Sequence, residues 1–291
     1  MSRWPPRFAP VARCGPPIPE FPLSCPRVIV TRPERDAQAW VTALAQRGLP
    51  AEALPLIRIE RLPTSPALQQ AWRDIASYAA LMFVSGNAVA AFFASNQAPA
   101  HIGKARTAID LIANEGLRYL APGPGTVAAL REMGLPDARI DAPAPDAGQF
   151  DSEALWALVA DRDWQGKRVL IVRGRSAGAE PAGGAGRDWL ARQLSAAGAM
   201  PEFLAVYQRS APLFTSPQRK TMAEAAVDGS VWLFSSSEAG GHLPQQDWSQ
   251  ARAVATHPRI AEAVRAAGWG VVAESRPALD DIVASIESMQ P

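Results

Sequence analysis

Residues 27–32, Arg-Val-Ile-Val-Thr-Arg, decide the fold, because the pattern returns at residues 168–173 as Arg-Val-Leu-Ile-Val-Arg. Each stretch holds a continuous apolar run rich in β-branched residues, 28–30 or 169–172, which is typical of a parallel strand buried on both faces. An amphipathic helical pattern follows each copy and ends at Gly48 or at Gly198, where a C-terminal glycine belongs. The spacing therefore predicts two related β-α-β units that lie far apart in the chain.

The remaining segments also occur in pairs. Each pair is an apolar strand pattern followed by a loop and a helical pattern, and the pairs are 81–85 with 231–235, 118–122 with 252–256, and 138–141 with 270–273. Final helices are expected at 151–160 and 278–288, and another strand at 53–59. Because strands and helices alternate throughout, we expect an α/β protein with two similar parallel-sheet domains.

Length and composition limit the number of domains and the classes of function to be considered. The 291 residues correspond to about two domains at ~150 residues each. A net charge of +1 argues against a nucleic-acid binder held by bulk charge. The 2 cysteines precede residue 27 and only 3 histidines occur, so we expect neither a metal site nor a cysteine nucleophile in the folded part. Since no run of 18 apolar residues occurs, we expect no membrane span.

The N-terminal residues 1–26 differ from the rest in composition. They hold eight of the 27 prolines, and proline removes amide donors and disfavours helix. We expect a disordered extension. It lacks the continuous apolar stretch of a signal peptide, so the expected location is cytoplasmic.

Candidate ligand-binding residues follow the predicted strands, because open parallel sheets bind ligands at the carboxyl ends of their strands. They are Arg32, Ser85, Asn87, Gly125, Thr126, Arg173, Gly174, Ser235, Ser236 and Thr256. Arg32 and Arg173 occupy equivalent places in the repeat, which favours paired contacts with anions. The serines also suit helix N-caps, and the sequence has no GxSxG motif of a serine hydrolase.

Two further features leave alternatives open. Gly123–Ala128 fits GxGxxA, with Asp141 18 residues after Gly123, which is compatible with a dinucleotide site, a helix N-terminus for another anion, or a structural turn. Tyr207 has Ile57 as its counterpart in the repeat, so the repeat does not require a tyrosine there. It is either a half-buried strand residue or a phenol that faces a cleft.

Over residues 27–288 the chain resembles the uroporphyrinogen-III synthase family. The resemblance is carried by the order and spacing of short motifs, which are Val28–Pro33, Pro55–Ile59, Phe83–Val89, Gly125-Thr126, Arg173-Gly174, Val206-Tyr207-Gln208 and the strand and helix after Glu274-Ser275. It implies two flavodoxin-like domains joined by a two-stranded connector near 55–62 and 204–210, with the active site in the cleft between them. Domain 1 would comprise 27–57 with 208–291, and domain 2 would comprise 61–204.

The resemblance also implies an activity. Hydroxymethylbilane, a linear tetrapyrrole with eight carboxylates, would be cyclised with loss of water and inversion of ring D, in a hydro-lyase reaction of haem biosynthesis that needs no cofactor. Tyr207 matches the family's tyrosine and would be the proton donor. The expected partner is this small substrate, with a monomeric enzyme in transient contact with the preceding pathway enzyme.

One stretch departs from the family pattern. Residues 256–260, Thr-His-Pro-Arg-Ile, replace a Gly-Pro-Thr-Thr-like turn. Two other classes stay open on the sequence alone, a non-catalytic two-lobed protein that binds a small anion and a nucleotide-dependent oxidoreductase.

Overall fold

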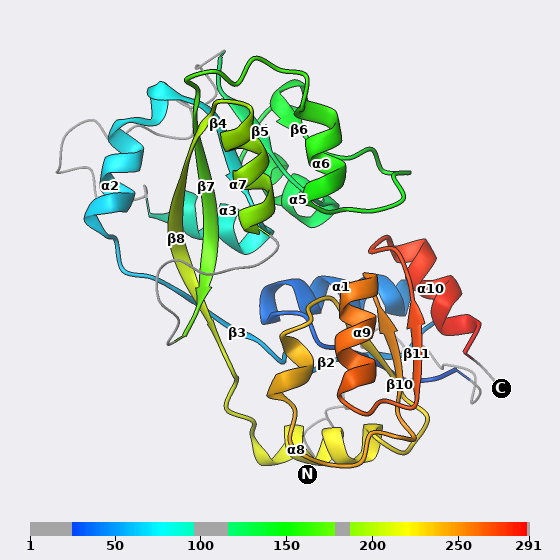
Figure 1. The fold of residues 1–291 in the computed structure, drawn as a ribbon. Coiled ribbons are helices and arrows are strands. Elements are labelled where there is room, and N and C mark those ends of the chain that lie inside the picture. Colours follow the sequence, from blue (N-terminus) through cyan, green and yellow to red (C-terminus); the bar gives the residue numbers. More distant parts are fainter. Residues whose placement is uncertain (1–24, 96–115, 178–186, 290–291) are drawn as a thin grey trace, which may run out of the picture.

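A computed structural model describes residues 25–95, 116–177 and 187–289. The chain forms two domains, each a sheet covered by helices on both faces (Figure 1). The expected α/β class with two similar domains is confirmed. Residues 1–24, which carry nearly all of the expected extension, lie outside the described residues.

The first domain, at the bottom of Figure 1, holds a sheet of order β11-β10-β9-β1-β2 with every neighbouring pair parallel. Its strands are β1 (Val28–Val30), β2 (Ala51–Ala53), β9 (Val231–Phe234), β10 (Arg252–Ala255) and β11 (Val271–Glu274). Its helices are α1 (Glu34–Gln46), α8 (Ser216–Ala225), α9 (Pro258–Ala266) and α10 (Leu279–Glu287), with a 3-10 turn at Ala239–His242.

Strand β1 shows why this stretch lacks polar alternation. Ile29 packs on one face of the sheet in a core that contains Trp232. Val28 and Val30 pack on the other face in a core that contains Leu44. All three β1 residues are buried, so an apolar side chain is needed at every position.

The second domain holds a sheet of order β3-β8-β7-β4-β5-β6. Its strands are β3 (Arg58–Arg61), β4 (Tyr78–Phe83), β5 (Arg118–Leu120), β6 (Ile140–Asp141), β7 (Arg168–Ser176) and β8 (Met200–Ser210). Its helices are α2 (Pro66–Arg73), α3 (Gly86–Ala94), α5 (Pro124–Glu132), α6 (Ser152–Val159) and α7 (Arg187–Ala196), with 3-10 turns at Ile75–Ser77 and Asp137–Arg139.

The two sheets have the same strand order once the repeat is followed. Reading from β2, the first sheet runs β2-β1-β9-β10-β11, and the second runs β8-β7-β4-β5-β6. The repeated strands β1 and β7 therefore take equivalent central places. Each lies beside a strand from the other half of its own domain, β9 or β4.

The connector is two-stranded, as the family resemblance implies. Strand β3 pairs antiparallel with the end of β8, in a register that places Arg58 opposite Ser210 and Arg61 opposite Tyr207. Figure 1 shows these two segments passing between the domains side by side. The limits predicted for the domains, 27–57 with 208–291 and 61–204, stay a prediction.

The single strand expected at 53–59 is wrong, because the chain forms two strands there that belong to different sheets. Strand β2 ends at Ala53 and β3 begins at Arg58. Between them the Leu54 and Leu56 amides donate to the Val30 and Thr31 carbonyls, while the leucine side chains are buried in the first domain. Pro55 has no amide proton to continue a ladder.

Candidate active site

In each sheet there is one pair of neighbouring strands whose following connections lead to opposite sides of the sheet. The pair is β1 and β9 in the first sheet and β7 and β4 in the second. Ligands of open α/β sheets bind at such places, at the carboxyl ends of the strands. Figure 1 shows the carboxyl ends of β7 and of β11 directed toward the opposite domain. The loops singled out from the sequence therefore lie between the domains.

Tyr207 lies on the β7–β4 side of this region. Its Oη atom lies 3.0 Å from the Oγ atom of Ser85, and the residue is 2% exposed. The ring rests against Gly174, where a Cβ atom would lie 2.3 Å from the tyrosine Cζ. The structure thus brings three predicted site residues together, and the half-buried strand position considered for Tyr207 is in fact a buried one.

A local irregularity in the sheet sets this geometry. The pairing of β7 with β8 shifts between Arg173 and Gly174, so that Arg173 faces Ala205 while Gly174 faces Tyr207. The extra residue, Val206, is a β-bulge, and bulges redirect side chains near functional sites. The bulge turns Tyr207 over the glycine and toward the start of α3.

The start of α3 and the start of α5 meet at this edge. Ser85 is the N-cap of α3, and its Oγ accepts the Ala88 amide proton at 3.2 Å. Asn87 lies half-buried in the first turn of the same helix. A Cβ on Gly86 would lie 3.2 Å from the Gly125 carbonyl oxygen, so the two helix ends are in close contact. Gly125 is exposed and Thr126 is buried.

Arg32, which follows β1 at its carboxyl end, is half-buried and stacks on an aromatic ring. Its guanidinium lies 4.4 Å from the centre of the Trp40 ring, and its buried Nε has no hydrogen-bond partner among the described residues. Burial lowers the pKa of Arg32 to about 10, although the nearby Asp36 carboxylate acts in the opposite direction. A desolvated guanidinium of this kind suits an incoming carboxylate.

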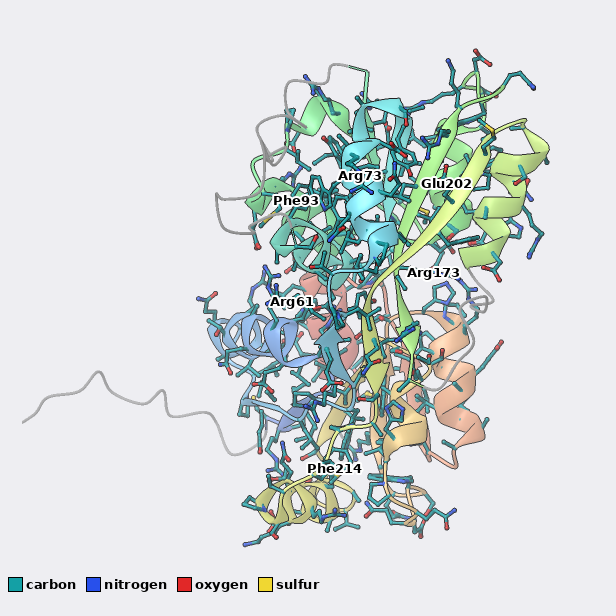
Figure 2. All side chains as sticks on the ribbon, turned by 90° about the vertical axis from the view of Figure 1, so that its left-hand side faces the viewer. Arg61, Arg73, Phe93, Arg173, Glu202 and Phe214 are labelled. Carbon is teal, nitrogen blue, oxygen red and sulfur yellow. The ribbon has the colours of Figure 1, made fainter. Side chains whose placement is uncertain are left out.

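Arg173 has a different environment, so the two arginines that the repeat makes equivalent are not equivalent in their contacts. Arg173 is 5% exposed, its Nη1 lies 3.4 Å from the Asp188 Oδ1, and its guanidinium lies over the Phe203 ring at 4.2 Å. In Figure 2 Arg173 lies at the level where the two domains meet. The sequence did not reveal Asp188 as its partner.

The loops of the first sheet contribute hydroxyl groups. Ser235 and Ser236 are half-buried after β9, and the Ser236 Oγ accepts the Glu238 amide proton at 3.3 Å. Thr256 is buried after β10, and its amide donates to the Phe234 carbonyl at 3.0 Å. The hydroxyl groups after β9 and β10 thus lie at the carboxyl ends of two neighbouring strands.

Polar contacts join the two domains around the site. Arg35 in α1 forms an ion pair with Glu132 in α5 at 2.8 Å. Arg276 donates to the Pro145 carbonyl at 3.1 Å.

A third contact joins two helix N-caps. His257 caps α9 through Nδ1, and its Nε2 lies 3.6 Å from the Oδ2 of Asp151, which caps α6. Sequence reasoning missed Arg35, Glu132 and Asp151, because it considered only residues that directly follow strands.

Asp141, the acidic residue that a dinucleotide site would need, is engaged by other side chains. The Asp141 carboxylate is buried and accepts hydrogen bonds from Arg118 at 3.0 Å and from Arg162 at 2.6 Å. Burial alone would raise the pKa of Asp141, but the hydrogen bonds from the two arginines outweigh it and lower the pKa. This carboxylate is fully engaged within the second domain and does not face a ribose.

Within residues 25–95, 116–177 and 187–289, no group of three or more His, Cys, Asp or Glu side chains is placed to hold a metal ion. No helix in those ranges is long and apolar enough to cross a membrane.

Comparisons with known proteins agree on one family. A family model described as uroporphyrinogen-III synthase HemD matches residues 38–284. A mutant uroporphyrinogen III synthase from the extreme thermophile Thermus thermophilus is similar in structure, with a TM-score of 0.53, 17% sequence identity, and coverage of 91% of this chain and 98% of that chain. The uroporphyrinogen-III synthetase of Helicobacter pylori has a TM-score of 0.55, 14% identity, and coverage of 91% and 99%. These likenesses show the fold, and the match over residues 38–284 shows that the chain belongs to the uroporphyrinogen-III synthase family.

Proposed function

We propose that the protein, as a uroporphyrinogen-III synthase of tetrapyrrole biosynthesis, acts as a hydro-lyase on hydroxymethylbilane and closes the ring with inversion of ring D. The observation that carries the residue assignment is the Tyr207 hydroxyl, held 3.0 Å from Ser85 at the carboxyl edge of the second sheet. This strand tyrosine offers a proton donor beside the start of α3 and beside loops that supply further polar groups. Nothing in these contacts favours a purely binding protein or an oxidoreductase.

The first step is departure of the terminal hydroxyl group of the bilane. The C–O bond breaks as Tyr207 donates its proton, so that the leaving group departs as water. The electron pair of the adjacent pyrrole nitrogen stabilises the cationic carbon, so that the product of this step is a protonated azafulvene. The positive end of the α3 dipole stabilises the developing phenolate.

The second step sets the isomer. The terminal pyrrole ring attacks the azafulvene through its substituted carbon and gives a spiro intermediate, which rearranges and loses a proton to form uroporphyrinogen III. The proton that is lost restores the phenol. Holding the substrate in the folded arrangement matters most, because unguided closure gives the unflipped isomer.

Contacts between the protein and the substrate carboxylates hold the substrate in this folded arrangement. We assign substrate carboxylates to Arg32 and to the polar edge made by Ser235, Ser236 and Thr256 in the first domain. The second domain adds Asn87 and the start of α5, with the exposed Gly125 and the buried Thr126, where helix amides favour negative charge. Arg173 joins them only by giving up part of its contact with Asp188.

The decisive assay incubates the protein with hydroxymethylbilane and separates the product isomers. We expect uroporphyrinogen III in excess. Formation of uroporphyrinogen I alone, at the spontaneous rate, would falsify the proposal.

The proton donor is tested by Tyr207→Phe. We expect kcat to fall at least about tenfold, the lower range for loss of a general acid. The matched control is Tyr78→Phe, which also removes a buried phenol hydrogen bond, to Glu202 at 2.9 Å, but near the amino ends of β4 and β8. Full activity of Tyr207→Phe would remove Tyr207 from the mechanism.

We also propose a monomer in the cytoplasm that receives its substrate from the preceding pathway enzyme through transient contact. A single chain supplies both sides of the site, so no second copy is needed to complete it. Direct transfer limits spontaneous closure of the free bilane. Sedimentation analysis of the pure protein tests the monomer, and a dimeric mass at micromolar concentration would contradict it.

A further inference from the structure

Ser85 has two hydrogen-bond partners on one oxygen atom. Its Oγ accepts the amide proton of Ala88 at 3.2 Å, which caps α3. The same Oγ lies 3.0 Å from the Oη of Tyr207. A serine hydroxyl has one proton to donate. Because the Ala88 amide uses an acceptor site on Oγ, the Ser85 proton is free to point at the tyrosine oxygen.

This direction matters for the tyrosine. When Ser85 donates to the phenol oxygen, the phenol's own proton is not used in the contact between the two residues. It stays available for a leaving group. After the phenol has lost that proton, the same Ser85 donor stabilises the phenolate, since hydrogen bonds to a charged form favour that form.

The rest of the tyrosine is already fixed. The ring lies over Gly174 so closely that a Cβ there would lie 2.3 Å from Cζ and from Cε2. Its backbone is held in β8 opposite Gly174, next to the bulge at Val206. With the ring constrained in this way, Ser85 is the contact that orients the hydroxyl group.

We propose that Ser85 is a positioning residue that acts through Tyr207, in place of the substrate-binding role that the strand-end pattern predicts for it. The inference rests on the proposed role of Tyr207 in the reaction. It links the cap of α3 to the phenol through one side-chain oxygen.

Four variants test the inference, Ser85→Ala, Ser85→Thr, Tyr207→Phe and the double variant with alanine and phenylalanine. We expect Ser85→Ala to lower kcat about tenfold, as loss of one well-placed hydrogen bond does, with KM changed less than about twofold. Ser85→Thr keeps the hydroxyl and the cap, so it retains most of the activity. In the Tyr207→Phe background, the alanine substitution lowers kcat by less than about twofold, because its target is gone.

A matched control separates capping from positioning. Ser65 caps α2 in the same way, with its Oγ accepting the Leu68 amide proton at 3.1 Å. We expect Ser65→Ala to lower the thermal unfolding midpoint about as much as Ser85→Ala and to leave kcat unchanged. Comparable loss of kcat in both serine variants would overturn the inference.

Three further outcomes would also decide against the positioning role. If Tyr207→Phe is impaired and Ser85→Ala still lowers kcat tenfold in that background, Ser85 does not act through the tyrosine, while the role of Tyr207 survives. A large rise in KM for Ser85→Ala would return Ser85 to substrate binding. Full activity of Tyr207→Phe would overturn both the proton donor and the positioning role.

Discussion

Gly174 is needed at its position for reasons of space. Its backbone is ordinary strand, yet a Cβ would penetrate the Tyr207 ring. The glycine and the tyrosine therefore form one unit, and a substitution at the glycine acts on the phenol. The repeat explains the strand at this position. The specific chemistry comes from Tyr207, which stands where the other copy of the repeat has Ile57, and from the glycine opposite it.

For Gly174→Ala we expect the ring to be displaced. The loss of stability is about 1–3 kcal/mol, which is the usual cost of overpacking a buried position, and synthase activity falls with it. Denaturant unfolding and the isomer assay measure the two effects. Gly148→Ala is the control, because no atom of the part of the chain that the structure describes lies within 4 Å of the Cβ it adds. Equal stability of the two variants would show that the ring adjusts freely.

At the scale of elements, Asp141 joins the end of β6 to β5 and to the segment after α6. Its carboxylate is held by Arg118 and Arg162, whose side chains are 33% and 35% exposed. The partly exposed arginines regain water when the carboxylate is removed, which limits the cost of breaking the pairs. Because Asp141 bonds to Arg118 in β5 and to Arg162 after α6, the cluster holds the edge strand β6 against its neighbours.

Asp141→Asn is expected to cost about 1–3 kcal/mol of unfolding free energy at neutral pH. The folded-state pKa of Asp141 is lowered, so its contribution is present above the ordinary aspartate pKa of about 3.9 and is lost as pH falls through the folded-state value. We therefore compare urea unfolding at neutral pH and at an acidic pH below the folded-state pKa of Asp141. The difference in unfolding free energy between wild type and variant should be smaller at the acidic pH. Asp137→Asn, in an exposed pair with Arg131, is the control and should have no measurable effect. A difference that is independent of pH would contradict this assignment.

Most of the strands and helix ends could be predicted from local sequence patterns. The apolar runs gave the buried strands. The glycines at 48, 198 and 268 end helices with φ values of 79°, 87° and 89°, a conformation that favours glycine. The split of residues 53–59 was not predictable from an apolar run, since it depends on which sheet each half joins.

The candidate site was predictable only in outline. The rule for strand ends located Ser85, Gly174 and Arg32. It did not reveal that Asp188 engages Arg173, because that pairing depends on how α7 packs against β7. The contacts between the domains were missed for the same reason, since they arise from tertiary packing and have no local signature.

On the scale of the whole molecule, polar contacts set how the domains face each other. The ion pair of Arg35 with Glu132 is exposed by 51% and 59%, and surface pairs of this kind contribute about 0–1 kcal/mol each. His257 and Asp151 are less exposed, at 21% and 16%. A few such contacts, with a connector of two strands, allow a hinge motion between the domains.

The double variant Arg35→Ala with Asp151→Ser should open the molecule. Serine keeps the cap of α6, so only the contacts between the domains are lost. We expect a larger radius of gyration in X-ray scattering without substrate and an almost unchanged unfolding midpoint. Arg47→Ala removes an exposed ion pair with Asp280 inside the first domain and is the control. Identical scattering of the double variant and wild type would show that other contacts hold the domains.

The pairing of β1 with β9 also has a consequence for synthesis on the ribosome. Strand β1 emerges early, but its neighbour at Val231–Phe234 is made after the whole second domain. At about 5–20 residues per second, roughly 10–35 s separate β2 from β9. During that time the first β-α-β unit has an unpaired strand edge, and the second domain receives its last strand, β8, before β9 is made. We therefore expect the second domain to complete its sheet before the first during translation, with the nascent first unit exposing an edge that can associate wrongly until β9 arrives.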